Sequence, residues 1–265
     1  VSSWKSEAAF NLIELGVLSV CAGILAVLVL PAIAASRLQG AGIGCLCNLR
    51  HLQTGAAMYA AENNDYLVPN AALGLSSAGE WCDCVSGESW GNSIDNTNPA
   101  ACEDGLLWPY LGGNLSVFRC PGDNVPSANG FRLRSYSMNG QMGAVYFQNT
   151  LSSLNRGFLY YSKNSDILRP TPANAFVFAD ESPDSINDGY LQISANPPEF
   201  PDIPACYLDG GCGFSFADGH AEIHRWLTTS LLIPVQQGLN KSNISPVGGS
   251  RNADWIWLIQ HSTSR

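Results

Sequence analysis

The feature that most constrains this chain is an uncharged stretch near its N-terminus. No residue from Leu15 to Ser36 is charged, and most of them are Leu, Val, Ile or Ala. Because a helix rises about 1.5 Å per residue, this stretch is long enough to cross the hydrocarbon core of a bilayer, which is roughly 30 Å thick. We therefore predict a membrane-spanning helix here.

A carboxylate stands at the start of this stretch. Glu14 would cost on the order of 2.5 to 3.5 kcal/mol as an unpaired ion inside a membrane. Cleavage between Ala9 and Phe10 would create an α-amino group on Phe10 within a turn of Glu14, in the same chain or in a neighbouring copy. Pro31 removes one helical hydrogen bond and predicts a kink late in the span.

These residues together resemble the N-terminus of the type IV pilins and pseudopilins: a short polar leader (residues 1–9), the run FNLIEL with Glu14 at its fifth position, the apolar stretch and Pro31. The resemblance implies cleavage by a prepilin peptidase before Phe10, where Ala9 replaces the usual Gly, and methylation of the Phe10 amine. It also implies a single pass of the inner membrane before assembly. The partners implied are that peptidase, an inner-membrane assembly platform, and further copies or other pilin-like subunits. The head would lie in the periplasm or outside the cell.

Two other interpretations of the stretch stay open. A secretory signal peptide could be cleaved at Ala32-Ile33-Ala34, but Glu7 and Glu14 against Lys5 make a poor basic region. A plain signal anchor gives no reason for Glu14.

We expect the rest of the chain, residues 37–265, to form one exported head domain. Its composition limits the kinds of partner that it can bind. The chain has 265 residues, 13 Lys and Arg against 22 Asp and Glu, and a net charge of -9. No basic stripe is available to neutralise phosphates, so nucleic-acid binding is not expected.

Cysteine is abundant, with nine residues, of which Cys21 lies in the apolar stretch. The part expected to be exported contains an even number of cysteines. This favours disulfides, although the sequence leaves their pairing open. The set is Cys45, Cys47, Cys82, Cys84, Cys102, Cys120, Cys206 and Cys212. A zinc site within either close pair is disfavoured, because neither has C-x-x-C spacing.

Residues 37–62 predict an amphipathic helix that lies against a sheet. Its apolar positions repeat at spacings of three and four, and they are Cys45, Leu49, Leu52, Ala56 and Tyr59. The glycines at 40, 42 and 44 predict a bend before it, and the helix should end near residues 63–65.

Residues 63–265 predict a sheet with long irregular connections. Strand-like runs occur at 116–120, 144–148, 158–162, 175–179, 191–194 and 213–217. Asp218-Gly219 follows the last run and predicts a hairpin with a type I′ turn. The segments CNLRHL, VFRCPGD, RSYSMNG and FVFADES, with this Asp-Gly, resemble a bacterial subgroup of pilin-like proteins that carries His, nine residues and Asp-Gly. Leu208 stands at the position of that His.

The loop at 71–98 carries Trp81 and Trp90 and is expected to be stapled by neighbouring cysteines. Its tryptophans could form a contact surface for a partner or a glycan, or could cover a small satellite core.

Chemistry-bearing clusters are few. Asp180, Asp184 and Asp188 offer oxygen ligands as weak calcium candidates, and calcium is known in some pseudopilin heads, but the spacing is not that of a twelve-residue calcium loop. His220, Glu222 and His224 alternate onto one strand face, where three ligands rarely converge on one ion. No nucleophile, phosphate-loop or dinucleotide motif occurs, so we expect neither an enzyme nor a cofactor.

We thus predict an α+β protein with a long N-terminal helix, which has a membrane half (10–36) and an amphipathic half. This helix packs on a pilin-like head that contains an antiparallel sheet and long loops stapled by disulfides. Its expected function is that of a structural subunit of a type II secretion or type IV pilus-like filament. The alternative is a membrane-anchored binding protein that does not polymerise and recognises a surface ligand such as a glycan through its Trp- and Cys-rich loop.

Overall fold

The computed structural model describes residues 11–72, 79–84, 86–143, 154–238 and 241–265. The predicted leader and the processing residues Ala9 and Phe10 lie outside this part of the chain, as does the predicted strand 144–148. The chain divides into two compact units, residues 1–40 and 41–265. We describe each unit by itself and call the second one the head.

One helix, α1 (Leu12–Glu62, 51 residues), begins in the first unit and ends in the head. Its helical backbone continues through Pro31 and through the glycines at 40, 42 and 44, so the predicted bend is not a break in the helix. Close packing explains Gly44, because a Cβ added there would lie 2.9 Å from Cγ of Pro121.

In the first unit, α1 is apolar and uncovered. Leu12–Leu30 is a 19-residue segment with a mean hydropathy of 2.5, and none of it is buried. By length and composition this segment could span a membrane.

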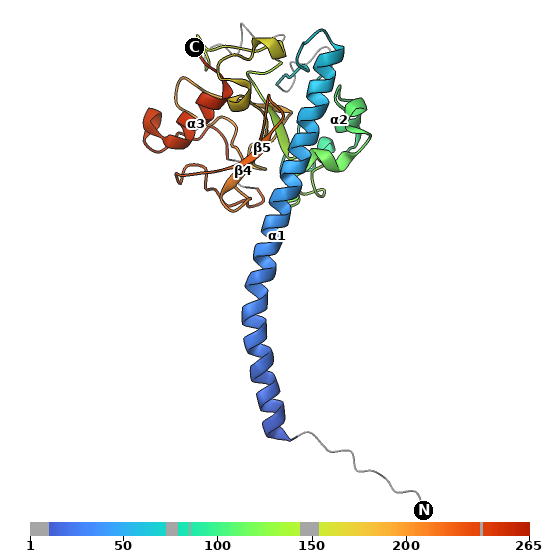
Figure 1. Cartoon of the computed structure of the whole chain (residues 1–265), viewed down its shortest axis with the longest axis vertical. Coiled ribbons are helices and arrows are strands. Elements are labelled where there is room, and N and C mark those ends of the chain that lie inside the picture. The colour runs from blue at the N-terminus through green and yellow to red at the C-terminus, as the bar shows by residue number, and fades with distance from the viewer. Residues whose placement is uncertain (1–10, 73–78, 85, 144–153, 239–240) are drawn as a thin grey trace, which may run out of the picture. The chain divides into compact units, whose positions relative to one another are not determined.

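In the described part of the head, five strands form one sheet, and two of them, β4 and β5, are labelled in Figure 1. They are β1 (Tyr136–Asn139), β2 (Phe176–Asp180), β3 (Tyr190–Leu191), β4 (Gly211–Phe216) and β5 (Ala221–Arg225). Their order is β3-β1-β2-β4-β5. The pair β1–β3 is parallel and the other pairs are antiparallel, so the predicted antiparallel sheet is correct except at this edge.

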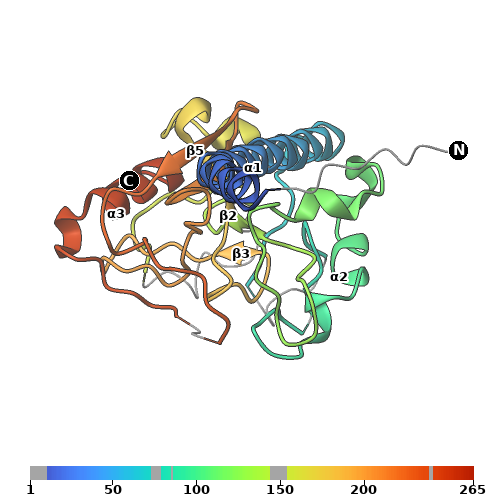
Figure 2. The same cartoon turned by 90° about the horizontal axis from the view of Figure 1, so that it is seen from below.

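Short helices complete the head. Beside the sheet, α2 (Ala100–Glu103) and α3 (Ala253–Ser262) lie at opposite sides in Figure 2. The 3₁₀-helices are Ile94–Asn96, Trp108–Leu111, Leu115–Phe118, Asn164–Asp166, Pro172–Asn174 and Gly249–Arg251.

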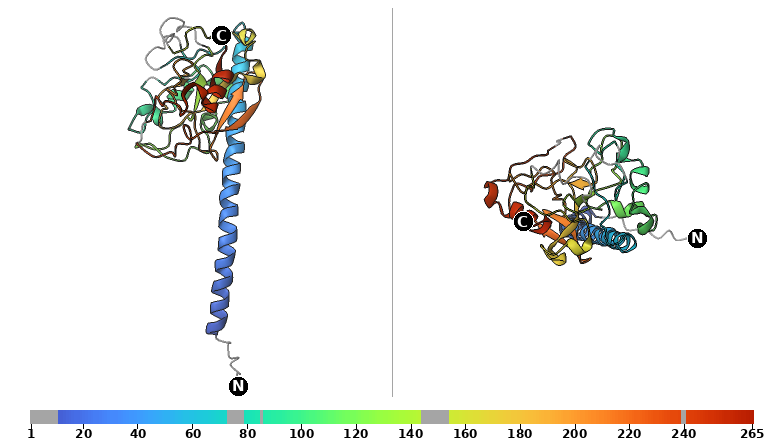
Figure 3. Two further views of the ribbon diagram at one scale, coloured as in Figure 1. Left: turned by 90° about the vertical axis from the view of Figure 1, so that its left-hand side faces the viewer. Right: turned by 90° about the horizontal axis from the view of Figure 1, so that it is seen from above.

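Each face of the sheet is covered by apolar side chains. On one face, Leu49 and Leu52 of α1 pack in one cluster with Met138 and Phe178, which confirms the predicted apolar stripe of that helix. On the other face, Phe214 of β4 packs in a second cluster with residues of α3, the helix next to the C-terminus in Figure 3. Full burial of one such side chain stabilises a fold by about 1.5 to 3 kcal/mol, so the two clusters fix the sheet between the helices.

The predicted strands have mixed outcomes. Two runs are confirmed, since 175–179 lies largely in β2 and 213–217 largely in β4, whereas β3 contains only Leu191 of the run 191–194. The run 116–120 is not a strand but a 3₁₀-helix, because Asn114 accepts a hydrogen bond from the Ser116 N–H (3.0 Å) and so caps a helical turn. The run 158–162 forms only an isolated bridge, from Tyr161 to Met142.

The structure confirms the predicted hairpin at Asp218-Gly219, but the predicted turn type is wrong. Of the two residues only Gly219 has a positive φ, 97°, whereas a type I′ turn needs two. The Phe216 carbonyl accepts from the Gly219 N–H (2.9 Å), and the Phe216 N–H donates to the His220 carbonyl (2.9 Å). This is a three-residue loop, in which Asp218 accepts a hydrogen bond from the His220 N–H (3.1 Å).

Candidate functional site

The N-terminus of α1 carries the predicted assembly residue Glu14. Its carboxylate accepts a hydrogen bond from the Asn11 N–H (3.0 Å), while the Asn11 side chain accepts one from the Ile13 N–H (3.4 Å). This arrangement is close to a capping box, except that Asn11 accepts from the second residue of the helix and not from the third, and it satisfies two of the free N–H groups at the helix end. Glu14 is exposed, so its carboxylate remains accessible in this chain.

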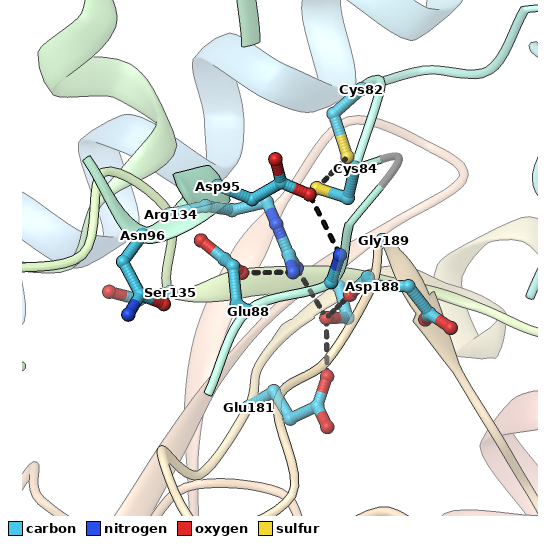
Figure 4. A network of polar contacts seen from close by, with 12 residues as sticks. Cys82, Cys84, Glu88, Asp95, Asn96, Arg134, Ser135, Glu181, Asp188 and Gly189 are labelled. Atoms are coloured by element: carbon cyan, nitrogen blue, oxygen red, sulfur yellow. Dashed lines mark hydrogen bonds and ion pairs between the residues drawn. The ribbon is translucent and has the colours of Figure 1, made fainter. Parts of the chain in front are cut away.

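Inside the head, a buried ion pair connects a loop to the sheet (Figure 4). Arg134, just before β1, donates hydrogen bonds to Glu88 and to Oγ of Ser137 (2.8 Å), and Ser137 in turn donates to Glu181. Both members of the ion pair are 1% exposed. Burial raises the pKa of Glu88 to about 7, although the Arg134 guanidinium opposes this shift.

Hydrogen bonds within the same loop also fix its backbone. Asp95 accepts hydrogen bonds from the N–H groups of Ser86 (2.7 Å) and Gly87 (2.8 Å). The sulfur atoms of Cys82 and Cys84 lie 3.8 Å apart, next to this network in Figure 4. These contacts assign the network a structural role, which is to attach the loop to β1 and β2.

A second buried cluster joins three distant parts of the head. The Cys45 thiol of α1 donates to Oδ2 of Asp180, the last residue of β2, over 2.7 Å. Cys120 completes the group, and the two sulfurs and the carboxylate oxygen all lie within 4.8 Å of one another. Burial raises the pKa of Asp180 to about 7 and raises that of the Cys45 thiol. Among the described residues this is the one group of three or more such side chains whose ligand atoms lie close enough together to hold a metal ion.

A surface groove borders this cluster. Its volume is about 610 Å³, and Cys47, Asn48, Arg119 and Phe131 line it together with Cys120. The Arg119 guanidinium lies 4.5 Å from the centre of the Phe131 ring.

The cluster was not predicted from the sequence, because its three members lie far apart along the chain and were assigned to different kinds of site. Cys45 and Cys120 stood among the disulfide candidates and Asp180 among the calcium candidates. Nothing in their spacing connects them. Cys45 lies in α1, Cys120 follows a 3₁₀-helix and Asp180 ends a central strand, so their approach depends on the tertiary fold.

The expected disulfide staples are not confirmed. All nine cysteines are free thiols, and Cys45, Cys82, Cys102, Cys120 and Cys212 are buried. The Cys206 thiol donates to the Ile233 carbonyl (2.8 Å), and the Cys212 thiol donates to the Asp180 carbonyl (3.2 Å).

The calcium candidates lie in different surroundings. Asp184 accepts a hydrogen bond from Nε1 of Trp90 (2.8 Å), and Asp188 accepts one from the Tyr190 N–H (2.8 Å). Both are buried, as is Asp180, so none of the three aspartates lies on a solvated surface. Within the described ranges the three aspartates do not form one group of ligands.

The histidines of the hairpin have aromatic neighbours. His220 stacks on Phe216 with ring centres 4.3 Å apart, and His224 stacks on Trp257 at 3.7 Å. Glu222 between them is exposed, and the three residues are not among the described groups that could hold a metal.

The loop tryptophans are buried and do not form a contact surface. Trp81 is 0% exposed, lies 5.1 Å from Phe178 between ring centres, and donates through Nε1 to the Gly189 carbonyl (2.8 Å). Trp90 is 5% exposed. Trp81 belongs to the same core cluster as α1, not to a small satellite core.

The fold and these sites define an α+β protein with an apolar N-terminal helix that could span a membrane and a head with a five-stranded, mostly antiparallel sheet. Comparison with protein-family models, with curated proteins and with solved structures found no match.

Proposed function

We propose that this protein is a pilin-like structural subunit that is processed before Phe10 and assembles into a type II secretion or type IV pilus-like filament. The observation that carries the proposal is the apolar helical segment Leu12–Leu30, none of which is buried in the single chain, with Glu14 in its first turn. Such a surface needs a lipid environment or the helices of neighbouring subunits to cover it.

The continuity of α1 supports the same proposal. One helix provides both the uncovered apolar segment and the apolar stripe that is buried in the head, so the same element would serve the filament core and the packing of the head. Before assembly the chain would cross the inner membrane once, with the head in the periplasm or outside the cell.

Glu14 would set the axial register between subunits. Its carboxylate accepts one local N–H and keeps acceptor capacity for a cation, for which the Phe10 amine of a neighbouring subunit is the proposed partner. The alternative, a binding protein that uses its Trp- and Cys-rich loop, loses support because Trp81 and Trp90 are buried.

The test is co-expression of the full chain with a prepilin peptidase and an assembly platform, followed by intact-mass analysis and isolation of filaments. We expect a mature chain that begins with N-methylated Phe10. Glu14→Ala should leave the near-ultraviolet circular dichroism of the head unchanged and abolish assembly. Ser19→Ala, an exposed change on the same helix, should assemble normally. Normal incorporation of Glu14→Ala, or an uncut chain, would contradict the proposal.

A further inference from the structure

The cluster of Cys45, Cys120 and Asp180 has the donor set of a zinc site. Thiolate sulfur and carboxylate oxygen are both ordinary zinc ligands, and the three atoms here converge within 4.8 Å from parts of the chain that are far apart in sequence. All three side chains are fully buried, at 0% exposure. Zinc in proteins usually has four donors, so these three side chains would leave its fourth position to a water molecule.

The surroundings of Asp180 orient it toward the two sulfurs. Its Oδ2 accepts the Gly213 N–H (3.1 Å), and its Oδ1 accepts the Tyr207 hydroxyl (3.2 Å). Hydrogen bonds of this kind fix the direction of a ligating carboxylate. A Cβ on Gly213 would lie 2.8 Å from the Asp180 oxygen and 2.9 Å from the Cys45 sulfur, so only glycine lets β4 approach the cluster this closely.

The charge of the cluster is not balanced by a basic side chain. The buried arginines of the described head are engaged elsewhere, Arg132 with Asp123 and Arg134 with Glu88. Asp180 takes part in none of the ion pairs between described residues. An ionised carboxylate buried without a counterion is costly, and a bound divalent cation would remove that cost.

We propose that Cys45, Cys120 and Asp180 bind one Zn²⁺ ion, with Tyr207 and Gly213 as positioning residues for Asp180. All three ligands bind in their deprotonated forms, so the protons of the two thiols, and that of the Asp180 carboxyl where it is protonated, leave to solvent as Zn²⁺ binds. Cys120 also lines the surface groove, which makes this groove the proposed entry route for the ion. The site links α1 to β2 inside the head, so the proposal does not depend on filament assembly.

A disulfide between Cys45 and Cys120 is the competing use of the same sulfurs. It would give no role to the contact between Cys45 and Asp180, and this contact is why the geometry favours the metal. The two outcomes exclude each other, because a thiol in a disulfide is not available as a thiolate ligand.

The test uses the full chain, purified in detergent with a thiol reductant and without chelator. We expect about one zinc per chain by elemental analysis, and thiolate-to-cobalt charge-transfer absorption when Co²⁺ replaces zinc. Cys120→Ser and the isosteric Asp180→Asn should each weaken zinc binding by more than about 10-fold, and Tyr207→Phe by about 10-fold. The control Cys102→Ser alters another buried thiol and should bind zinc normally.

Three results would overturn the proposal. The reduced wild-type chain could bind no zinc, the Cys120→Ser variant could bind it as tightly as the wild type, or peptide mapping could find Cys45 and Cys120 joined in a disulfide that persists under the purification conditions. The metal content of the wild type decides the question even where a variant does not fold.

Discussion

Arg134 and Glu88 form an ion pair in which both side chains are almost fully buried, although 46 positions separate them in the chain. Glu88 lies in a loop without regular structure, and Arg134 immediately precedes β1. A buried pair of this kind is weak evidence for added stability, but loss of one partner leaves an uncompensated charge in the interior. The pair therefore makes the loop sensitive to changes at either residue.

Replacement of Arg134 should show this sensitivity. Arg134→Met leaves Glu88 buried without its cation, and we expect the free energy of unfolding to fall by about 3 to 5 kcal/mol at pH 8. Arg225→Met is the matched control, because Arg225 pairs with Asp209 on the surface, where both side chains are more than 60% exposed. Its loss should cost less than about 1 kcal/mol. Denaturant titration of both variants measures the difference, and equal losses would contradict the argument.

Glu88 should also make the stability of the head dependent on pH. Its ordinary pKa is 4.5 and burial raises it to about 7 in the folded chain, where Arg134, Arg132, Asp123 and Asp95 are the charged groups that act on it. Between these values the unfolded chain has released its proton while the folded chain still holds it. Stability therefore falls as pH rises through this window, by about 3 kcal/mol in total, and stays constant above pH 7 for this group.

Glu88→Gln isolates this contribution from those of the other acids. The difference in unfolding free energy between the wild type and Glu88→Gln should change by about 3 kcal/mol between pH 4.5 and pH 7, with the steeper decline in the wild type. Denaturant titrations at several pH values give both curves. Parallel curves would show that Glu88 titrates in the folded chain as it does in the unfolded one.

Trp81 should act on stability and not on binding. Its indole is fully buried against Phe118 and Phe178, so Trp81→Ala removes a large core side chain and should destabilise the head by about 3 to 5 kcal/mol. Leu168→Ala, at a side chain that is 72% exposed, should change stability by less than about 0.5 kcal/mol. Thermal unfolding distinguishes them. An unchanged melting temperature for Trp81→Ala would restore the exposed-loop interpretation.

Local pattern was sufficient to predict much of the scaffold. The uncharged stretch and the apolar stripe at Leu49 and Leu52 specify α1, because helical periodicity depends only on neighbours along the chain. Continuous apolar runs predict β2 and β4 in the same way. The strand predicted at 116–120 is wrong, because the capping hydrogen bond at Asn114 determines the local backbone and strand propensity does not.

The buried polar sites required the tertiary fold. The acidic residues at 180–188 have the composition of a surface loop, but Asp180, Asp184 and Asp188 are buried in the structure, where Trp90 donates a hydrogen bond to Asp184. Likewise, the convergence of Cys45, Cys120 and Asp180 depends on how α1 lies on the sheet. Sequence spacing carries no information about such contacts, so the two cysteines were predicted as disulfide candidates and the aspartate as a separate calcium candidate.

Gly44 tests the packing of α1 in the head. A methyl group at this position would meet Cγ of Pro121 at 2.9 Å, so Gly44→Ala should lower the free energy of unfolding by about 1 to 3 kcal/mol, despite the better helix propensity of Ala. Gly40→Ala is the control on the same helix, since no atom lies within 4 Å of its added Cβ and we expect no loss of stability. Denaturant titration of the full chain in detergent compares the two. If Gly44→Ala were as stable as Gly40→Ala, the glycine at 44 would not be required by the contact with Pro121, and the helix would have room to shift on the head.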